Sequence, residues 1–71
     1  MELQFITLND VRGVLNISAA QAYSLVRSGE LRAIRVGGRG QWRVELTELN
    51  AYIDRAYRAA EAAIVDETAT T

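Results

Sequence analysis

The sequence contains no cysteine, no histidine and no proline, and two of these absences restrict its chemistry. Without cysteine there is no disulfide or thiolate metal site, and without histidine the commonest general base and metal ligand is missing. No apolar run approaches the roughly 20 residues of a membrane-spanning helix. The start "MELQFITLND" lacks the basic residues and apolar core of a secretory signal. We therefore expect a cytoplasmic protein with no metal, no cofactor and no membrane contact.

The charge is small in total but strongly segregated. The 71 residues, 49% of them hydrophobic, allow one small compact domain with a formal net charge of -1. From residue 12 to residue 43 there are six arginines and one acid, whereas residues 44–71 hold six acids and two arginines. Such asymmetry indicates a surface that binds a polyanion, with a separate acidic segment. The alternative is a set of arginines scattered over a solvated surface.

The first helical pattern is "LNDVRGVL". Thr7 is placed to cap it, with the acid Asp10 in its first turn. Gly13 weakens the segment by roughly 1 kcal/mol relative to alanine, unless its missing side chain permits a close helix contact. Asn16 ends the pattern. Four apolar residues fall on one side of the predicted helix: Leu8, Val11, Val14 and Leu15.

A second helical pattern, "SAAQAYSLVRSGEL", follows at once. Ser18 and Gln21 have the S-x-x-Q spacing of a capping box, which satisfies two backbone amides at a helix start. Gly29 is well placed for a left-handed residue at the helix end. The inward face is formed by Ala22, Leu25 and Val26. Two short helices joined by the tight turn "NI" predict a helix-turn-helix.

The stretch "IRVGGRGQWRV" alternates apolar and basic residues on either side of a glycine loop, which predicts a β-hairpin. We predict three cross-strand pairs: Val36 with Trp42, Ile34 with Val44, and Arg35 with Arg43. This register gives one apolar face toward the core and one face with two opposed arginines. Opposed like charges are destabilising in water, but they become reasonable if a polyanion lies across that face.

The segment "ELTELNAYIDRAYRAAEAAIV" keeps apolar residues three or four apart and predicts one amphipathic helix of roughly 18 residues. Its first half is needed to close the core, and we place the end of the domain at Tyr57. Residues 58–71 are then a helical extension followed by the polar end "DETATT", which we expect to be disordered. The extended apolar stripe leaves two interpretations open. It is an extension that folds back or stays exposed, or it contacts a neighbouring copy or a protein partner.

The stretch from Phe5 to about Ile53 resembles the excisionase-type, MerR-like winged helix-turn-helix family of DNA-binding proteins. The start of the first helix, the run "RSGELRAIRVGGR" and the "WR" pair before the last helix carry the resemblance. It implies an α fold with a small β-hairpin: two short helices, a hairpin wing and a longer C-terminal helix. It also implies that the helix from Ser18 to Ser28 enters the major groove, with the wing near the minor groove.

The candidate DNA-binding residues lie on the second helix and on the wing. Gln21 could read adenine, and arginine is the usual reader of guanine, although Arg27 could instead stabilise its own helix end. We expect Trp42 to pack in the core, whereas Tyr23 could pack on the domain or contact a phosphate. The full set is Ser18, Ala19, Gln21, Tyr23, Ser24, Arg27, Arg35, Arg39 and Arg43, with no catalytic or metal-binding residue.

Three functions compete for this sequence. The leading one is a sequence-specific DNA-binding protein without catalytic activity, specifically an excisionase that acts with an integrase on double-stranded DNA and associates with further copies through its C-terminal helix. A small transcriptional regulator of the same fold is the close alternative. A protein-interaction module, such as an antitoxin-like partner, would leave the arginines of the wing unexplained. An enzyme is disfavoured because the carboxylates are dispersed along one helix without pairing.

Overall fold

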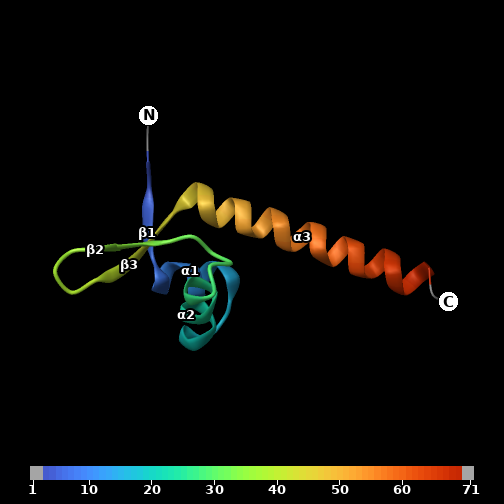
Figure 1. The fold of residues 1–71 in the computed structure, drawn as a ribbon, viewed down its shortest axis with the longest axis horizontal. Helices are drawn as coiled ribbons and strands as arrows, with labels where there is room; N and C mark the ends of the chain where they lie inside the picture. Colours follow the sequence, from blue (N-terminus) through green and yellow to red (C-terminus); the bar gives the residue numbers. More distant parts are fainter. Residues whose placement is uncertain (1–2, 70–71) are drawn as a thin grey trace.

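The computed structural model describes residues 3–69 and the side-chain exposure of residues 3–65. Three helices and a small antiparallel sheet form a winged helix-turn-helix. The elements follow one another as β1 (Phe5–Thr7), α1 (Leu8–Leu15), α2 (Ala19–Arg27), β2 (Ile34–Val36), β3 (Gln41–Glu45) and α3 (Leu46–Ala69). Figure 1 shows the hairpin β2–β3 projecting on one side of α1 and α2, and α3 projecting on the other. The molecule is therefore elongated, with extents of 54 × 31 × 19 Å.

Both short helices begin at the predicted caps. The hydroxyl of Thr7 accepts a hydrogen bond from the N–H of Asp10 at 3.0 Å, and the Asp10 carboxylate accepts one from the N–H of Thr7 at 3.0 Å. This reciprocal pair satisfies two amides that a helix start otherwise leaves unpaired. Asn16 ends α1 in the left-handed region at a φ of 55°, and Gly29 follows α2 at a φ of 84°. The helix-turn-helix prediction is confirmed.

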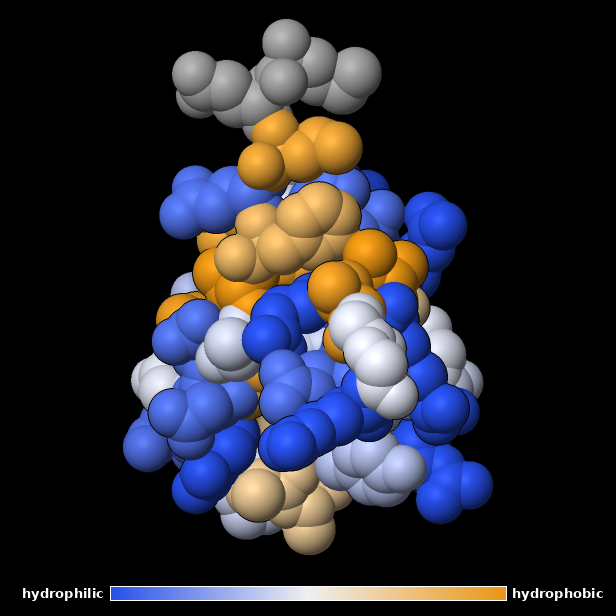
Figure 2. Space-filling model, turned by 90° about the vertical axis from the view of Figure 1, so that its left-hand side faces the viewer, coloured by the Kyte–Doolittle hydropathy of each residue, from blue (hydrophilic) through white to orange (hydrophobic). Residues whose placement is uncertain are grey.

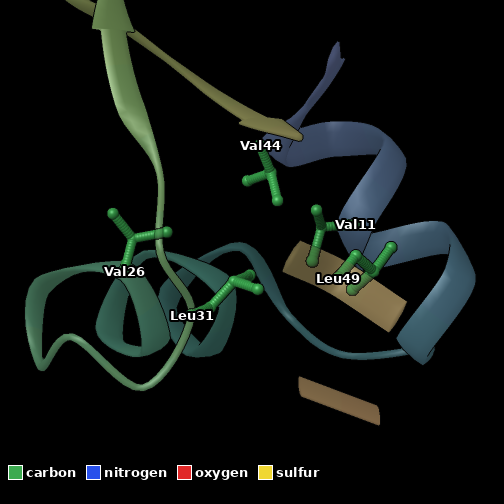
Figure 3. Packing of buried hydrophobic residues seen from close by; sticks show 5 residues of the cluster. All are labelled: Val11, Val26, Leu31, Val44 and Leu49. Atoms are coloured by element: carbon green, nitrogen blue, oxygen red, sulfur yellow. The ribbon is translucent and has the colours of Figure 1, made fainter. Parts of the chain in front are cut away.

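The core lies where the three helices and the sheet meet. Five side chains converge there, each from a different part of the chain: Val11, Val26, Leu31, Val44 and Leu49 (Figure 3). They come from α1, α2, the segment before β2, β3 and α3, and none is more than 8% exposed. Trp42 packs against this cluster and is half-buried, as predicted. Val14, which we expected on the inward face of α1, is 60% exposed, and the prediction for that residue was wrong.

The sheet has three strands in the order β1-β3-β2, and the sequence analysis missed β1. β1 pairs antiparallel with β3, with Ile6 opposite the buried Val44. One further backbone hydrogen bond extends the pairing beyond the strands: the N–H of Leu46 donates to the carbonyl of Gln4 at 2.8 Å. The strand therefore ties the chain start to the beginning of α3 and holds the wing against the helices.

The predicted hairpin register was wrong by one residue. In the structure Ile34 lies opposite Arg43, Arg35 opposite Trp42, and Val36 opposite Gln41. The loop is a four-residue turn, closed by a hydrogen bond of 3.1 Å from the N–H of Gly40 to the carbonyl of Gly37, whose φ is 83°. Because side chains alternate between faces, a shift of one residue moves all of β2 to the other side of the sheet.

The outer face of the sheet carries an exposed apolar surface to which β1 and β2 both contribute. Phe5 is 42% exposed, Ile34 50% and Val36 46%, although both β2 residues were predicted to face the core. Figure 2 looks at the molecule from the wing side. There, apolar side chains gather toward the N-terminal end, and hydrophilic side chains cover most of the remainder.

The C-terminal helix is longer than predicted. Its first two turns pack on the core of the domain, as expected, through the side chains of Leu46, Leu49, Tyr52 and Ile53. From Asp54 to Val65 every side chain is exposed. The helix continues to Ala69 and so includes the first residues of the polar end, whereas residues 70 and 71 lie outside the described residues. The disorder expected for this end stays a prediction.

Candidate nucleic-acid interface

The start of α2 is a capping box that uses two of the predicted site residues. The hydroxyl of Ser18 accepts from the N–H of Gln21 at 3.1 Å, and Oε1 of Gln21 accepts from the N–H of Ser18 at 2.9 Å. A bidentate contact with adenine needs both Oε1 and Nε2 of a glutamine. The capping bond fixes the side chain of Gln21 in one orientation. Gln21 can therefore read adenine only if Oε1 accepts a second hydrogen bond.

The other candidates on α2 are also exposed. Ala19, Tyr23, Ser24 and Arg27 are all exposed, with Tyr23 at 42%. The guanidinium of Arg27 lies 5.7 Å from the centroid of the Tyr23 ring, within range of a cation–π contact. Arg27 thus leans along its own helix toward Tyr23, and the two side chains form one exposed unit of a cation and an aromatic hydroxyl.

Gln21 and Ser24 lie on another side of the same helix. They line a shallow groove together with Ile17, Leu25 and Tyr52 of α3. The polar face predicted from sequence is therefore divided into two edges. One edge carries the Tyr23–Arg27 unit, and the other carries Gln21 and Ser24 beside the C-terminal helix.

Arg39 occupies the tip of the wing. It is exposed, and within the described part of the chain no hydrogen bond or ion pair engages its guanidinium. Its neighbours Gly38 and Gly40 provide no side chain for it to pack on. A guanidinium offers five donors in a planar fork suited to phosphate oxygens, so Arg39 is the cation of the wing best placed to contact a polyanion.

Arg35 and Arg43 do not form the predicted pair, because they lie on opposite faces of the sheet. The guanidinium of Arg35 lies 4.7 Å from the centroid of the Trp42 ring, on the inner face. Arg43 is half-buried on the outer face, where it donates to the carbonyl of Trp42 at 2.9 Å and to Oε1 of Gln41 at 3.0 Å. Both arginines therefore have roles within the wing that the sequence did not indicate.

The charge of Arg43 also acts on the first helix. The N–H of Thr7 donates to the Asp10 carboxylate, and this bond, the hydroxyl of Thr7 and the positive charge of Arg43 together lower the pKa of Asp10. The effect of Arg43 is the smallest of these, and the hydrogen bonds with Thr7 account for most of the lowered pKa.

Two further arginines of the basic segment have partners within the chain. Arg32 forms an ion pair of 3.3 Å with Glu48 of α3, and Arg12 donates to Oδ1 of Asn9 at 3.2 Å. Only the pair of Arg32 with Glu48 offsets a positive charge, because Asn9 is neutral, so the charge balance read from sequence overstates the free positive charge by that of Arg32. The cations available on the two candidate surfaces are Arg27, Arg35 and Arg39, with Arg43 only partly available.

The described residues contain no cluster of three or more side chains able to hold a metal ion. Nor does any helix among them combine the length and the apolar character required to cross a membrane.

Two capped helices joined by a left-handed residue, with a hairpin wing beside them, define a helix-turn-helix protein of the DNA-binding class. A family model described as "Helix-turn-helix domain" matches residues 5–57, and the chain belongs to this family. No curated protein and no solved structure matches the chain significantly.

Proposed function

We propose that the protein is an excisionase: a DNA-binding protein without catalytic activity that acts with an integrase in the cytoplasm. The helix-turn-helix family supports binding to DNA. The observation that supports the proposal most is the arrangement of exposed cations, with Arg27 on α2 and the unengaged Arg39 at the wing tip. Such a helix and wing suit a major groove and an adjacent minor groove or phosphate.

The division of the α2 surface suggests how the site is read. Arg27 is the side chain suited to guanine, and Gln21, with Oε1 held in the capping box, presents its Nε2 as a donor. Ser24 and Ala19 are short and leave room for the approach of the bases. Ser18 holds the helix start, and its own contact with DNA is expected to be a phosphate rather than a base.

The size of the interface supports the need for a partner. A short recognition helix and one wing bury an area near the low end for single DNA-binding modules. Specific occupancy then requires an integrase already bound to the DNA, or further copies of the chain. Either requirement suits an excisionase, which would bend an attachment site and recruit the recombinase.

The experiment that tests the proposal is an excision assay with a candidate integrase, and the first choice is any integrase whose gene is found next to the gene for this protein. A plasmid carries the two attachment sites that this integrase recombines, and recombination is measured with and without the protein. We expect excision to depend on the protein and to fall when the Arg39→Ala variant replaces it. The control is Arg12→Ala, which removes an arginine outside both candidate surfaces and should have little effect. DNA binding without any effect on recombination would favour the alternative, a transcriptional regulator.

A further inference from the structure

Gln21 carries the longest polar side chain on the first turn of α2. It is the third residue of the helix, it follows the small Ala19 and Ala20, and it is exposed. The first residues of a recognition helix are those that meet base edges in the major groove. Two alanines before Gln21 leave room for such an approach. Gln21 therefore lies where a side chain can read a base.

The capping box decides which end of the Gln21 amide is free. The backbone N–H of Ser18 is a donor, so only the oxygen of the amide can accept it, and Oε1 does so at 2.9 Å. The N–H of Gln21 returns a hydrogen bond of 3.1 Å to the hydroxyl of Ser18. This reciprocal pair turns Oε1 back toward the helix start and leaves Nε2 as the outer atom of the amide.

Nε2 has two hydrogens to donate. Among the described residues, the capping bond at Oε1 is the hydrogen bond that the Gln21 side chain makes. Ser24 and Tyr52 line the same shallow groove as Gln21, but neither bonds to it in the described part of the chain. The donors of Nε2 are therefore available to a ligand, whereas the acceptor is already in use.

We infer that Gln21 reads its base by donation alone and selects guanine. Guanine presents two acceptors in the major groove, N7 and O6, and thymine presents one, O4. Adenine sets the donor N6 beside its acceptor N7, and cytosine presents a donor alone. A donor left facing a donor loses its hydrogen bond to water without gaining another. The order of preference is therefore guanine, thymine, adenine and cytosine.

The usual contact of glutamine with adenine differs from this one, because it needs Oε1 to accept from N6 while Nε2 donates to N7. Turning Oε1 fully toward the base would leave the N–H of Ser18 without its partner at the helix start. The inference rests on the proposed function, since it requires α2 in the major groove. It goes further by naming the base and the atom that selects it.

The variant Gln21→Glu tests the inference without removing the cap. Glutamate completes the same capping box, and an acid in the first turn is favoured by the helix dipole, so the Tm should not fall. Its free oxygen is an acceptor, which suits N4 of cytosine. Binding to a randomised duplex library, followed by sequencing, gives the base preference at each position. We expect guanine to change to cytosine at one position of the same strand.

Two control variants separate base reading from stability and charge. Gln21→Ala keeps the hydroxyl of Ser18 as a cap and removes the reader. It should reduce a preference of roughly three- to tenfold, the effect of one hydrogen bond, to within about twofold. Arg39→Ala lowers the net charge by the same one unit as Gln21→Glu. It should weaken binding and leave the preference at this position unchanged.

NMR observes the capping bond directly in the unmodified protein. Coupling across the hydrogen bond joins the amide nitrogen of Ser18 to Cδ of Gln21, and we expect it both in the free protein and in the DNA complex. Loss of this coupling on binding, with the couplings along the helices retained, would show that Oε1 turns to the base. That result would overturn the inference.

The library experiment also distinguishes failure of the inference from failure of the proposed function. An adenine preference in the unmodified protein at the position that Gln21→Ala flattens would overturn the inference. Identical preferences for Gln21→Glu and the unmodified protein at every position would do the same, although DNA binding persists in both cases. Absence of binding to any duplex would reject the proposed function and the inference together. A change from guanine to cytosine, with no effect of the protein on excision, would support the inference and reject only the excisionase role.

Discussion

Arg35 and Trp42 lie directly opposite each other on the two strands of the wing, with the guanidinium 4.7 Å from the centroid of the indole ring. The side chain of Arg35 therefore covers one face of the half-buried Trp42 ring. Gly40 lies close by, since a Cβ at that position would meet Cδ of Arg35 at 3.5 Å. The wing is therefore ordered from within, before it meets any DNA.

The first prediction concerns this contact. We expect Trp42→Ala to lower the free energy of unfolding by about 2–3 kcal/mol, slightly below the loss for a fully buried aromatic residue. Arg35→Ala should cost about 0.5–1 kcal/mol through the lost cation–π contact. A double-mutant cycle measured by urea unfolding gives the coupling between the two. A coupling near zero would show that the stack contributes nothing to stability.

A second prediction concerns Gly13. It is exposed in the middle of α1, and a Cβ added there meets no atom within 4 Å. The close helix contact considered from sequence is therefore absent at this residue. Gly13→Ala should stabilise the protein by up to about 1 kcal/mol. For a domain of this size that gain raises the Tm by roughly 4–8 °C, and a lower Tm would contradict the geometry of α1.

The third prediction concerns the pH dependence of the first cap. Asp10 has a lowered pKa in the folded state, because it accepts from Thr7 and faces Arg43. Its contribution to stability is therefore present above the unfolded pKa of about 3.9 and is lost as the pH falls through the folded value. Asp10→Ala should lower the Tm at neutral pH, and the difference should shrink below about pH 4. A difference that is the same at pH 7 and at pH 3 would exclude this linkage.

A fourth prediction separates the roles of the wing arginines. Arg39→Ala should weaken DNA binding at an unchanged Tm, because the exposed side chain makes no hydrogen bond, ion pair or ring contact within the described residues. Arg43→Ala should lower the Tm as well, since it removes bonds to Trp42 and Gln41 and a charge beside Asp10. Gel-shift titration and thermal melting of the two variants provide the comparison. Equal effects on both measurements would mean that the two arginines act alike.

The helix starts could be predicted because their signals are local. Thr7 with Asp10 and Ser18 with Gln21 each satisfy their bonds within one turn. The hairpin register could not be predicted in this way, because loops of four and five residues both preserve the alternation within each strand. The four-residue loop sets Arg35 opposite Trp42. Their stacking is a contact between two strands, so the pattern within either strand does not reveal it.

β1 was missed because its evidence is not local. A strand of three residues has too little periodicity to be recognised, and Ile6 is held by Val44, far along the chain. For the site, the exposure of Arg39 followed from its glycine neighbours. The engagement of Arg35 and Arg43 depends on the register and could not be foreseen.

The central claim is that this chain of net charge -1 binds DNA through a local cationic surface. The most direct measurement is a titration of a duplex library with the protein at several salt concentrations. The account predicts binding at low salt, with log affinity falling against log salt at about 0.9 per phosphate and hence a slope of roughly -3 to -4 for three to four free arginines. Absence of binding to any duplex at low salt, or an affinity independent of salt, would contradict it.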